Sequence, residues 1–188
     1  MARLTIRLAM EADIPTLRTM QERSLRLLGC SHYTPAQIEA FIARIGTMDD
    51  YLVADRTYLV AELAGKIVGC GGWTTRLPGY ARHAQSEAHA PDPSRATIRS
   101  IFVDPGAARQ GVGRRVMNAV ENALRAAGFR SAELGATENG RDFYGRLGYE
   151  ALGVFQVDLG GVGMPFTRMG KTLAPANADG IRPVRMTA

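Results

Sequence analysis

Residues 98–113 have the types and spacing to bind a phosphate group. They read Ile-Arg-Ser-Ile-Phe-Val-Asp-Pro-Gly-Ala-Ala-Arg-Gln-Gly-Val-Gly, an apolar strand that ends at Asp104-Pro105 and is followed by Gly111 and Gly113. Glycine lets a backbone approach a ligand closely, and the unpaired N–H groups at a helix N-terminus attract an anion. The segment therefore predicts a phosphate-binding turn between a strand and an amphipathic helix.

Two common phosphate motifs do not match this chain. A dinucleotide-binding G-x-G-x-x-G would need its third glycine at Val116, and the turn follows a hairpin instead of opening a first strand-helix-strand unit. Gly170-Lys171-Thr172 looks like the end of a P-loop, but Pro165 stands where that motif requires a glycine. Leu173-Ala174-Pro175 also prevents the helix that should follow. Both interpretations are rejected.

The elements before the turn follow from periodicity and from helix-start signals. Thr5–Leu8 reads as a short strand, and Asp13 with Pro15 suits the first turn of a helix. Thr34-Pro35-Ala36-Gln37 matches a capping box and predicts a second helix. Residues 57–63 and 66–75 read as the two strands of a hairpin, and three glycines in the second strand predict a bulge. Residues 77–95 are predicted to form a loop.

The elements after the turn complete one domain. Residues 97–103 and 130–136 are strands joined by a helix, which predicts that they are parallel neighbours. A short helix over about residues 140–147 precedes two last strands, 149–159 and 165–172. Residues 1–172 are expected to form a single domain and residues 173–188 a loose tail. The buried stripe of the long helix, which should end at Gly128, is expected to comprise Val112, Val116, Val120, Leu124 and Ala127.

Composition excludes several classes of protein. Hydrophobic residues make up 46% of the chain and charged residues 22%, as in a globular protein. No apolar run reaches the roughly 20 residues that span a bilayer, and we expect a cytoplasmic protein without membrane contact. The net charge is +5, but the arginines are scattered, so nucleic acid is not an expected partner. Cys30 and Cys70 have no metal or redox spacing, and no metal is expected.

Two separate segments resemble the GNAT superfamily of acyl-CoA-dependent N-acetyltransferases. Residues 98–116 resemble the family's R/Q-x-x-G-x-G/A pyrophosphate motif. Residues 139–149 are similar to a signature in which an asparagine precedes F-Y-x-x-L-G-F, here Asn139 and Phe143 to Tyr149. The resemblance covers roughly residues 5–172. It implies an α+β (mixed α/β) fold with a central mixed, mostly antiparallel sheet of six to seven strands, a splayed parallel pair, and helices on both faces.

The resemblance implies acetyl-CoA as co-substrate and a set of residues that bind it. One position departs from the motif: its first residue, usually Arg or Gln, is Ala108 here, and Arg109 supplies a positive charge at the next position. Backbone N–H groups from Gln110 to Arg114 supply most of the phosphate hydrogen bonds in such a motif. The expected cofactor-binding residues are Ile101, Phe102, Val103, Arg109, Gln110, Gly111, Val112, Gly113, Arg114, Asn139 and Tyr144.

The implied reaction is direct attack of an amine on the thioester in a ternary complex. Ile101 and Val103 would bond the pantetheine arm like an added strand, and a backbone N–H near Phe102 would stabilise the oxyanion. Tyr144 matches the tyrosine that protonates the leaving thiolate; the alternative is that it only packs beside Phe143. A thiol pKa near 8.5 makes a phenol a sufficient acid.

The sequence leaves the general base and the acceptor open. His83, Glu87, His89 and Glu133 are candidates for the base, as is water. Cys70 as a nucleophile and Trp73 as a recognition residue are less favoured than packing roles for both. The acceptor pocket is expected from the first helix pair, including residues 30–34, and from the loop 77–95; these regions carry no acidic cluster. The acceptor is a small-molecule or protein amine.

Three alternatives remain beside that interpretation. A non-catalytic acyl-CoA-binding module on the same fold would share the cofactor residues but would not need Tyr144. Transfer to oxygen, or of a longer acyl chain, would use the same site with another acceptor or donor. A homodimer is compatible with the fold, although nothing in the sequence places its interface.

Overall fold

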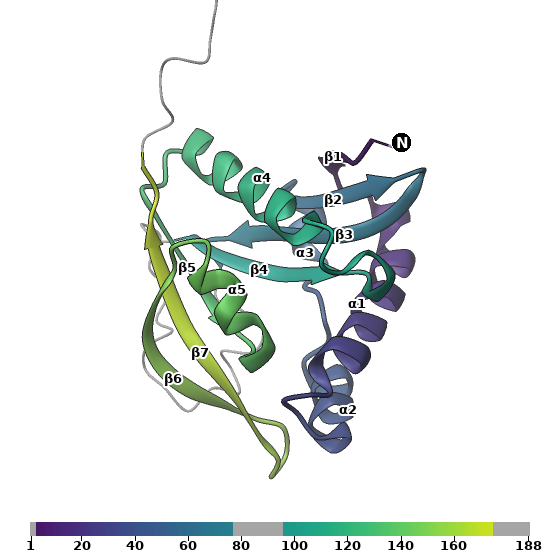
Figure 1. Ribbon diagram of the computed structural model, residues 1–188, viewed down its shortest axis with the longest axis vertical. Coiled ribbons are helices and arrows are strands. Elements are labelled where there is room, and N and C mark those ends of the chain that lie inside the picture. The colour runs from purple at the N-terminus through teal and green to yellow at the C-terminus, as the bar shows by residue number, and fades with distance from the viewer. Residues whose placement is uncertain (1–2, 77–95, 175–188) are drawn as a thin grey trace, which may run out of the picture.

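One sheet of seven strands forms the centre of the protein. The computed structural model describes residues 3–76 and 96–174. The strand order is β1-β2-β3-β4-β5-β7-β6, and every neighbouring pair is antiparallel except β4–β5 (Figure 1). This is the predicted α+β fold with a mostly antiparallel sheet. The strands are β1 Thr5–Leu8, β2 Tyr58–Leu63, β3 Lys66–Thr74, β4 Ala96–Val103, β5 Ser131–Ala136, β6 Glu150–Asp158 and β7 Gly163–Thr172.

Helices cover both faces of the β2–β4 half of the sheet. α4 packs on β2, β3 and β4 through Val116, Val120 and Leu124, while Leu17 of α1 and Leu52 of α3 belong to a separate core on the other face (Figure 1). The helices are α1 Ile14–Gly29, α2 Pro35–Arg44, α3 Tyr51–Ala54, α4 Val112–Ala126 and α5 Arg141–Gly145, with single turns of 3-10 helix η1 Glu11–Asp13, η4 Pro105–Ala107 and η5 Glu138–Gly140. No helix in these two ranges is long and apolar enough to cross a membrane.

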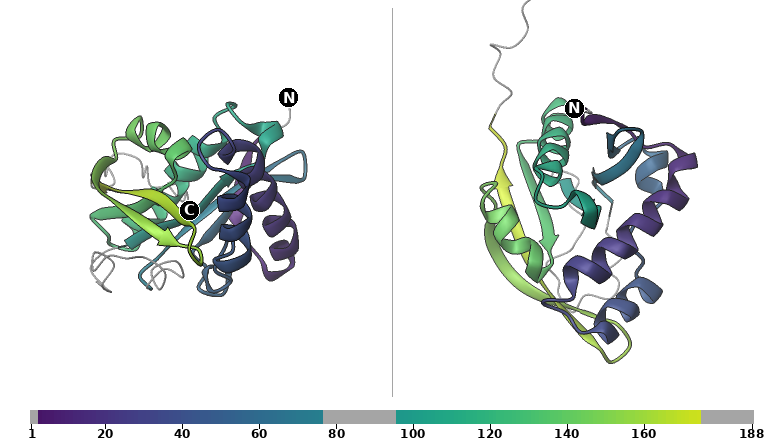
Figure 2. Two further views of the ribbon diagram at one scale, coloured as in Figure 1. Left: turned by 90° about the horizontal axis from the view of Figure 1, so that it is seen from below. Right: turned by 45° about the vertical axis from the view of Figure 1, so that its right-hand side comes forward.

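A third core joins α2 to the other half of the sheet. Ile38 of α2 packs with Phe155 of β6 and with Met164 and Phe166 of β7. Figure 2 shows the far end of the β6–β7 hairpin reaching the helix pair α1–α2. The two halves of the sheet are therefore connected at β4–β5 and again through α2.

Local signals in the sequence account for two of these elements. Thr34 and Gln37 form the predicted capping box at the start of α2, with the Thr34 hydroxyl accepting from the Gln37 N–H at 3.2 Å. Ala64 and Gly65, at φ +51° and +74°, form the tight turn between β2 and β3. The predicted hairpin is confirmed, and the expected bulge appears as a register shift between Cys70 and Gly72 against β4.

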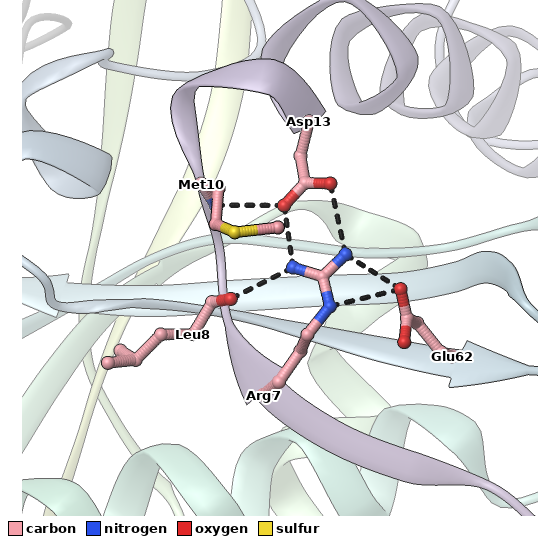
Figure 3. Close-up of polar contacts among 5 residues, drawn as sticks. All are labelled: Arg7, Leu8, Met10, Asp13 and Glu62. Atoms are coloured by element: carbon pink, nitrogen blue, oxygen red, sulfur yellow. Dashed lines mark hydrogen bonds and ion pairs between the residues drawn. The ribbon is translucent and has the colours of Figure 1, made fainter.

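An ionic cluster fastens the start of α1 to the sheet. Arg7 of β1 donates to Asp13 at 2.7 and 3.0 Å and to Glu62 of β2 at 2.7 Å (Figure 3). Asp13 also accepts from the backbone N–H of Met10 at 2.8 Å. The Arg7 guanidinium lowers the pKa of Asp13 below its ordinary value, because it stabilises the charged carboxylate.

A second cluster fastens α4 to β7. Glu121 is buried and accepts from Lys171 at 2.8 Å, from the Tyr149 hydroxyl at 3.1 Å and from Arg125 at 3.1 Å. Lys171 belongs to Gly170-Lys171-Thr172, the segment that resembles the end of a P-loop. It lies in a strand and forms an ion pair with the buried Glu121, which agrees with the rejection of that motif.

One prediction about the core is wrong, and a second segment differs from expectation. Ala127 was expected in the buried stripe, but α4 ends at Ala126 and Ala127 is exposed, because Gly128 at φ +92° turns the chain away. Leu173, at the start of the expected tail, is buried and donates its N–H to the carbonyl of Arg130 at 2.8 Å. The expected loop 77–95 and residues 175–188 lie outside the described residues.

Candidate active site

The parallel strands β4 and β5 separate after three residue pairs. Ala96, Thr97 and Ile98 pair with residues 132–134, and from there β5 pairs with β7 alone. β4 continues to Val103 while pairing with β3. Within the described residues, the β5-facing edge of β4 over residues 100–103 therefore has no strand partner. The predicted parallel, splayed pair is confirmed.

A kink in β4 lies at the point of separation. Ser100 has φ +50°, a left-handed conformation that is unfavourable for any residue with a side chain. Its carbonyl accepts a hydrogen bond from the buried Tyr58 hydroxyl at 2.7 Å. Gln21 donates to the Tyr58 oxygen at 2.8 Å and accepts from Thr47 at 2.8 Å. This polar chain runs from Thr47 to the kink, and both of its ends line the cavity described next.

A cavity of about 800 Å³ occupies the opening between the two strands. It is bounded by β4, the start of α4, the η5–α5 segment, and the ends of α1 and α2. The sequence-predicted residues that line it are Ile101, Phe102, Val103, Arg109, Gly111, Val112, Gly113, Arg114, Asn139 and Tyr144. Gln110 is the exception: its side-chain amide donates to the Gly106 carbonyl at 3.1 Å, and it does not line the cavity.

The start of α4 presents free backbone donors and positive charge at one end of this cavity. The N–H groups of Val112, Gly113 and Arg114 donate to no group within the described residues, and the first turn of α4 carries no acidic side chain. Gly111 precedes them at φ +81°, a conformation that suits glycine. Arg109 and Arg114 add positive charge. The donors and charges fit a diphosphate.

Close packing sets the position of that helix start. A Cβ atom at Gly113 would lie 3.2 Å from Cζ of Phe143 and 3.4 Å from Cγ2 of Val103. Glycine at this position therefore lets the first turn of α4 approach both α5 and β4. The free N–H groups of α4 and the unpaired edge of β4 lie next to each other for this reason.

Tyr144 presents an available phenol to the cavity. Its ring packs edge-on against Phe143 at 5.1 Å and Tyr149 at 6.1 Å between ring centroids. Its hydroxyl makes no hydrogen bond to any described residue. Burial raises the pKa of Tyr144 above its ordinary value, so the phenol stays protonated near neutral pH. Such a group can donate a proton.

The other end of the cavity is formed in part by the expected residues 30–34. Ser31 and His32 line it, whereas Cys30 is exposed and its thiol donates to the Leu27 carbonyl at 3.3 Å. Tyr33 is buried; its hydroxyl donates to the Pro165 carbonyl at 2.8 Å and accepts from the Glu138 N–H at 2.9 Å. Tyr33 thus fastens η5 beside the cavity.

Asp49 and Arg99 line the same end, and sequence reasoning missed both. Nη2 of Arg99 donates to Oδ2 of Asp49 at 2.8 Å. The two residues are far apart in the sequence and no local motif links them. The hydrogen bonds that link Thr47, Gln21 and Tyr58 to Ser100 were missed for the same reason.

The remaining candidates lie elsewhere. Glu133 does not line the cavity and forms an ion pair with Arg168 at 3.8 Å. Cys70 is buried and accepts a weak hydrogen bond from Gln21 at 3.5 Å, and burial raises the pKa of its thiol. Trp73 packs on Phe129 with ring centroids 5.4 Å apart. His83, Glu87 and His89 fall outside the described residues.

Comparisons with known proteins agree on one family. Residues 21–149 match the model of the acetyltransferase (GNAT) family. A curated relative, an uncharacterised N-acetyltransferase from the hisH-hisA intergenic region of Azospirillum brasilense, is 37% identical over 90 residues, which are 48% of this chain and 48% of the relative. That match therefore spans about half the length of the relative.

Solved structures share the fold at low sequence identity. A GCN5-related N-acetyltransferase from Rhodopseudomonas palustris aligns with a TM-score of 0.71 at 22% identity, over 92% of this chain and 98% of that one. PaiA N-acetyltransferase from Thermoplasma acidophilum, in complex with coenzyme A, aligns with a TM-score of 0.67 at 16% identity, over 90% and 99% of the two chains. Within residues 3–76 and 96–174, no group of three His, Cys, Asp or Glu side chains could hold a metal.

Proposed function

The chain belongs to the acetyltransferase (GNAT) family, and from this premise we propose that it transfers acetyl from acetyl-CoA to an amine within the cavity between β4 and β5. The observation that carries the proposal is the position of the free N–H groups of α4 beside the unpaired edge of β4. Free N–H groups at a helix start suit a diphosphate, and an unpaired strand edge suits an extended arm that carries amide groups. Coenzyme A contains both.

The chain's own groups can perform each part of the binding. The N–H groups of residues 112–114, with Arg109 and Arg114, hold the diphosphate. The β4 edge at Ile101 and Val103 bonds the pantetheine arm, and Asn139 lies at its far side. Gln110 contributes its backbone, because its side chain is engaged with Gly106. Acetyl-CoA supplies the activated thioester when bound.

Proton transfer to sulfur is assigned to Tyr144. Its raised pKa keeps it protonated, and its hydroxyl is not committed to another described residue. A backbone N–H near Phe102, just after the kink at Ser100, would donate to the developing oxyanion. Preorganised dipoles and orientation supply much of the rate in such a site. The proposal is therefore an enzyme that depends on few special side chains.

The available Tyr144 hydroxyl favours an enzyme over a non-catalytic acyl-CoA-binding module. Release of free thiol from acetyl-CoA in the presence of an amine tests this directly. We expect Tyr144→Phe to lower kcat by about 10²- to 10⁴-fold while the Kd for acetyl-CoA changes little. Equal turnover of Tyr144→Phe and the wild type would contradict the role of Tyr144. Absence of thiol release with any amine would favour the binding module.

Two further features belong to the proposal. We place the protein in the cytoplasm, because Cys30 and Cys70 are both free thiols, as a reducing compartment maintains them. A homodimer is also proposed, and size-exclusion chromatography with light scattering tests it.

A further inference from the structure

An apolar wall forms part of the acceptor end of the cavity. It consists of the partly exposed side chains of Leu28, Phe41, Ile45 and Met48 and of the Phe102 ring of β4. The same segments also contribute the polar residues Ser24, Ser31, His32 and Thr47 to the lining. Apolar surface left partly open inside a cavity favours a ligand that covers it with carbon.

A single carboxylate interrupts this wall. Asp49 is the only acidic residue that residues 24–49 and the lining part of β4 contribute to the cavity. Its side chain is 18% exposed, and Oδ2 accepts from Arg99 at 2.8 Å and from the Tyr51 hydroxyl at 3.3 Å. Within the described residues, Oδ1 of Asp49 accepts no hydrogen bond. One carboxylate oxygen is thus available to a donor in the cavity.

The position of Asp49 relates it to the reacting atoms. Arg99, its partner, is the residue directly before the Ser100 kink, where β4 and β5 have just separated. Asp49 contacts the end of the Arg99 side chain, and it lines the same cavity as Ser100 and Phe102. A donor held on Asp49 therefore lies in the cavity that the thioester is proposed to enter. The other cavity carboxylates, Glu138 and Asp142, belong to the wall made by η5 and α5, and Glu138 pairs with Arg141 at 3.5 Å.

We propose that the acceptor is a small primary monoamine on an apolar body, alkyl or aromatic, whose ammonium group binds Asp49 and whose carbon skeleton covers the wall around Phe41 and Ile45. This inference rests on the proposed acetyltransferase function and names its substrate class. A polyamine fits less well, since Asp49 is the one carboxylate that residues 24–49 and the lining part of β4 offer to an ammonium group. A lysine side chain in a polypeptide would bring polar backbone to the same surface.

The proton balance of this transfer is complete. The ammonium first loses one proton to water, and its nitrogen lone pair then forms the C–N bond. The C–S bond breaks with its electron pair on sulfur, which takes a proton from Tyr144. The nitrogen loses a second proton, which restores the Tyr144 phenol. An ammonium and a thioester become an amide and a thiol, with one proton released to solvent.

Acceptor preference in the wild-type protein is the first test. Thiol release from acetyl-CoA is measured with phenethylamine, isoamylamine, spermidine and a lysine-containing peptide. We expect kcat/KM for the two apolar monoamines to exceed that for spermidine and the peptide by about 10-fold or more. Preference for spermidine or for the peptide overturns the substrate class and leaves the acetyltransferase proposal intact. No thiol release with any of the four overturns the inference, and calorimetry with acetyl-CoA then shows whether the cofactor site stands.

A matched pair of variants tests the role of Asp49. Asp50 is its neighbour, but the Asp50 side chain is 53% exposed, pairs with Arg18 on the surface and does not line the cavity. We expect Asp49→Asn to raise the KM for phenethylamine by about 10- to 100-fold with little change in the Kd for acetyl-CoA. Asp50→Asn should leave both unchanged. An unchanged KM in Asp49→Asn, or an equal rise in both variants, overturns the assignment.

A second variant keeps the test decisive if Asp49→Asn folds poorly. Met48→Glu adds a carboxylate to the apolar wall. It should raise the KM for phenethylamine and lower that for spermidine. If both constants are unchanged, the wall does not contact the acceptor and the inference fails.

Discussion

The hydroxyl of Tyr58 donates a hydrogen bond of 2.7 Å to the carbonyl of Ser100, the residue at the kink of β4. Tyr58 is completely buried, and its burial raises the pKa of its phenol, which keeps it a donor. Ser100 is strained at φ +50°, and such a conformation persists only where the surroundings hold it. This bond therefore connects the interior of the protein to the place where β4 and β5 separate.

Removing that hydroxyl should affect catalysis as well as stability. Tyr58→Phe leaves the Ser100 carbonyl and the Gln21 amide without their shared partner, and we expect a loss of about 1–3 kcal/mol in the free energy of unfolding. Because the kink then relaxes, kcat should fall also. Urea unfolding and thiol-release kinetics measure the two effects.

Tyr149→Phe is the control for Tyr58→Phe. Tyr149 is also buried and also loses a hydrogen bond, to Glu121, but it does not line the cavity. We expect it to lower stability with kcat nearly unchanged. If the two variants have the same kcat, the Tyr58–Ser100 bond has no part in forming the site.

The Arg7–Asp13 pair should make stability depend on pH. The pKa of Asp13 is lowered in the folded protein, so the unfolded state binds the proton more readily. Its stabilising contribution is present above the unfolded pKa of about 3.9 and is lost as the pH falls through the folded pKa. The difference in unfolding free energy between wild type and Asp13→Asn should be constant near neutral pH and shrink below about pH 4. A difference that grows on acidification would contradict this account.

The buried carboxylate of Glu121 should be among the most sensitive positions outside the cavity. Glu121→Ala leaves Lys171 and Arg125 without their shared partner inside the protein. We expect a loss of about 3–5 kcal/mol, typical for breaking a buried ion pair on one side. Asp50→Asn, which breaks an exposed pair, should change stability by less than about 1 kcal/mol. Equal effects in chemical denaturation would show that the Glu121 cluster is not structurally important.

The parts of the fold that the sequence predicted are those with local signals. The capping box at Thr34, the turn at Ala64-Gly65 and the glycines at the start of α4 each act within a few residues, so the local sequence is enough to predict them. Ala127 was misplaced because a hydrophobic period does not state at which residue a helix ends. The parallel pairing of β4 and β5 could be predicted because a helix connects them.

The parts of the site that could not be predicted depend on distant residues. The Asp49–Arg99 pair joins positions 50 residues apart, and the Tyr58–Ser100 bond joins positions 42 residues apart. Neither pair stands in a recurring motif. Asp49 and Asp50 are indistinguishable in sequence, and only the fold places one in the cavity and the other on the surface.

Binding of acetyl-CoA tests the central claim most directly, and the two ends of α4 supply matched variants. Gly111 and Gly128 are both left-handed glycines with open space at the Cβ position, one at each end of the helix. Valine at either position is strained and should lower stability similarly. In calorimetry we expect the wild type and Gly128→Val to bind acetyl-CoA with a Kd of about 1 μM. Gly111→Val should bind acetyl-CoA about 10-fold or more weakly, because valine at this position displaces the N–H groups of residues 112–114. No heat with the wild type, or the same Kd in all three proteins, would contradict the phosphate site at the start of α4.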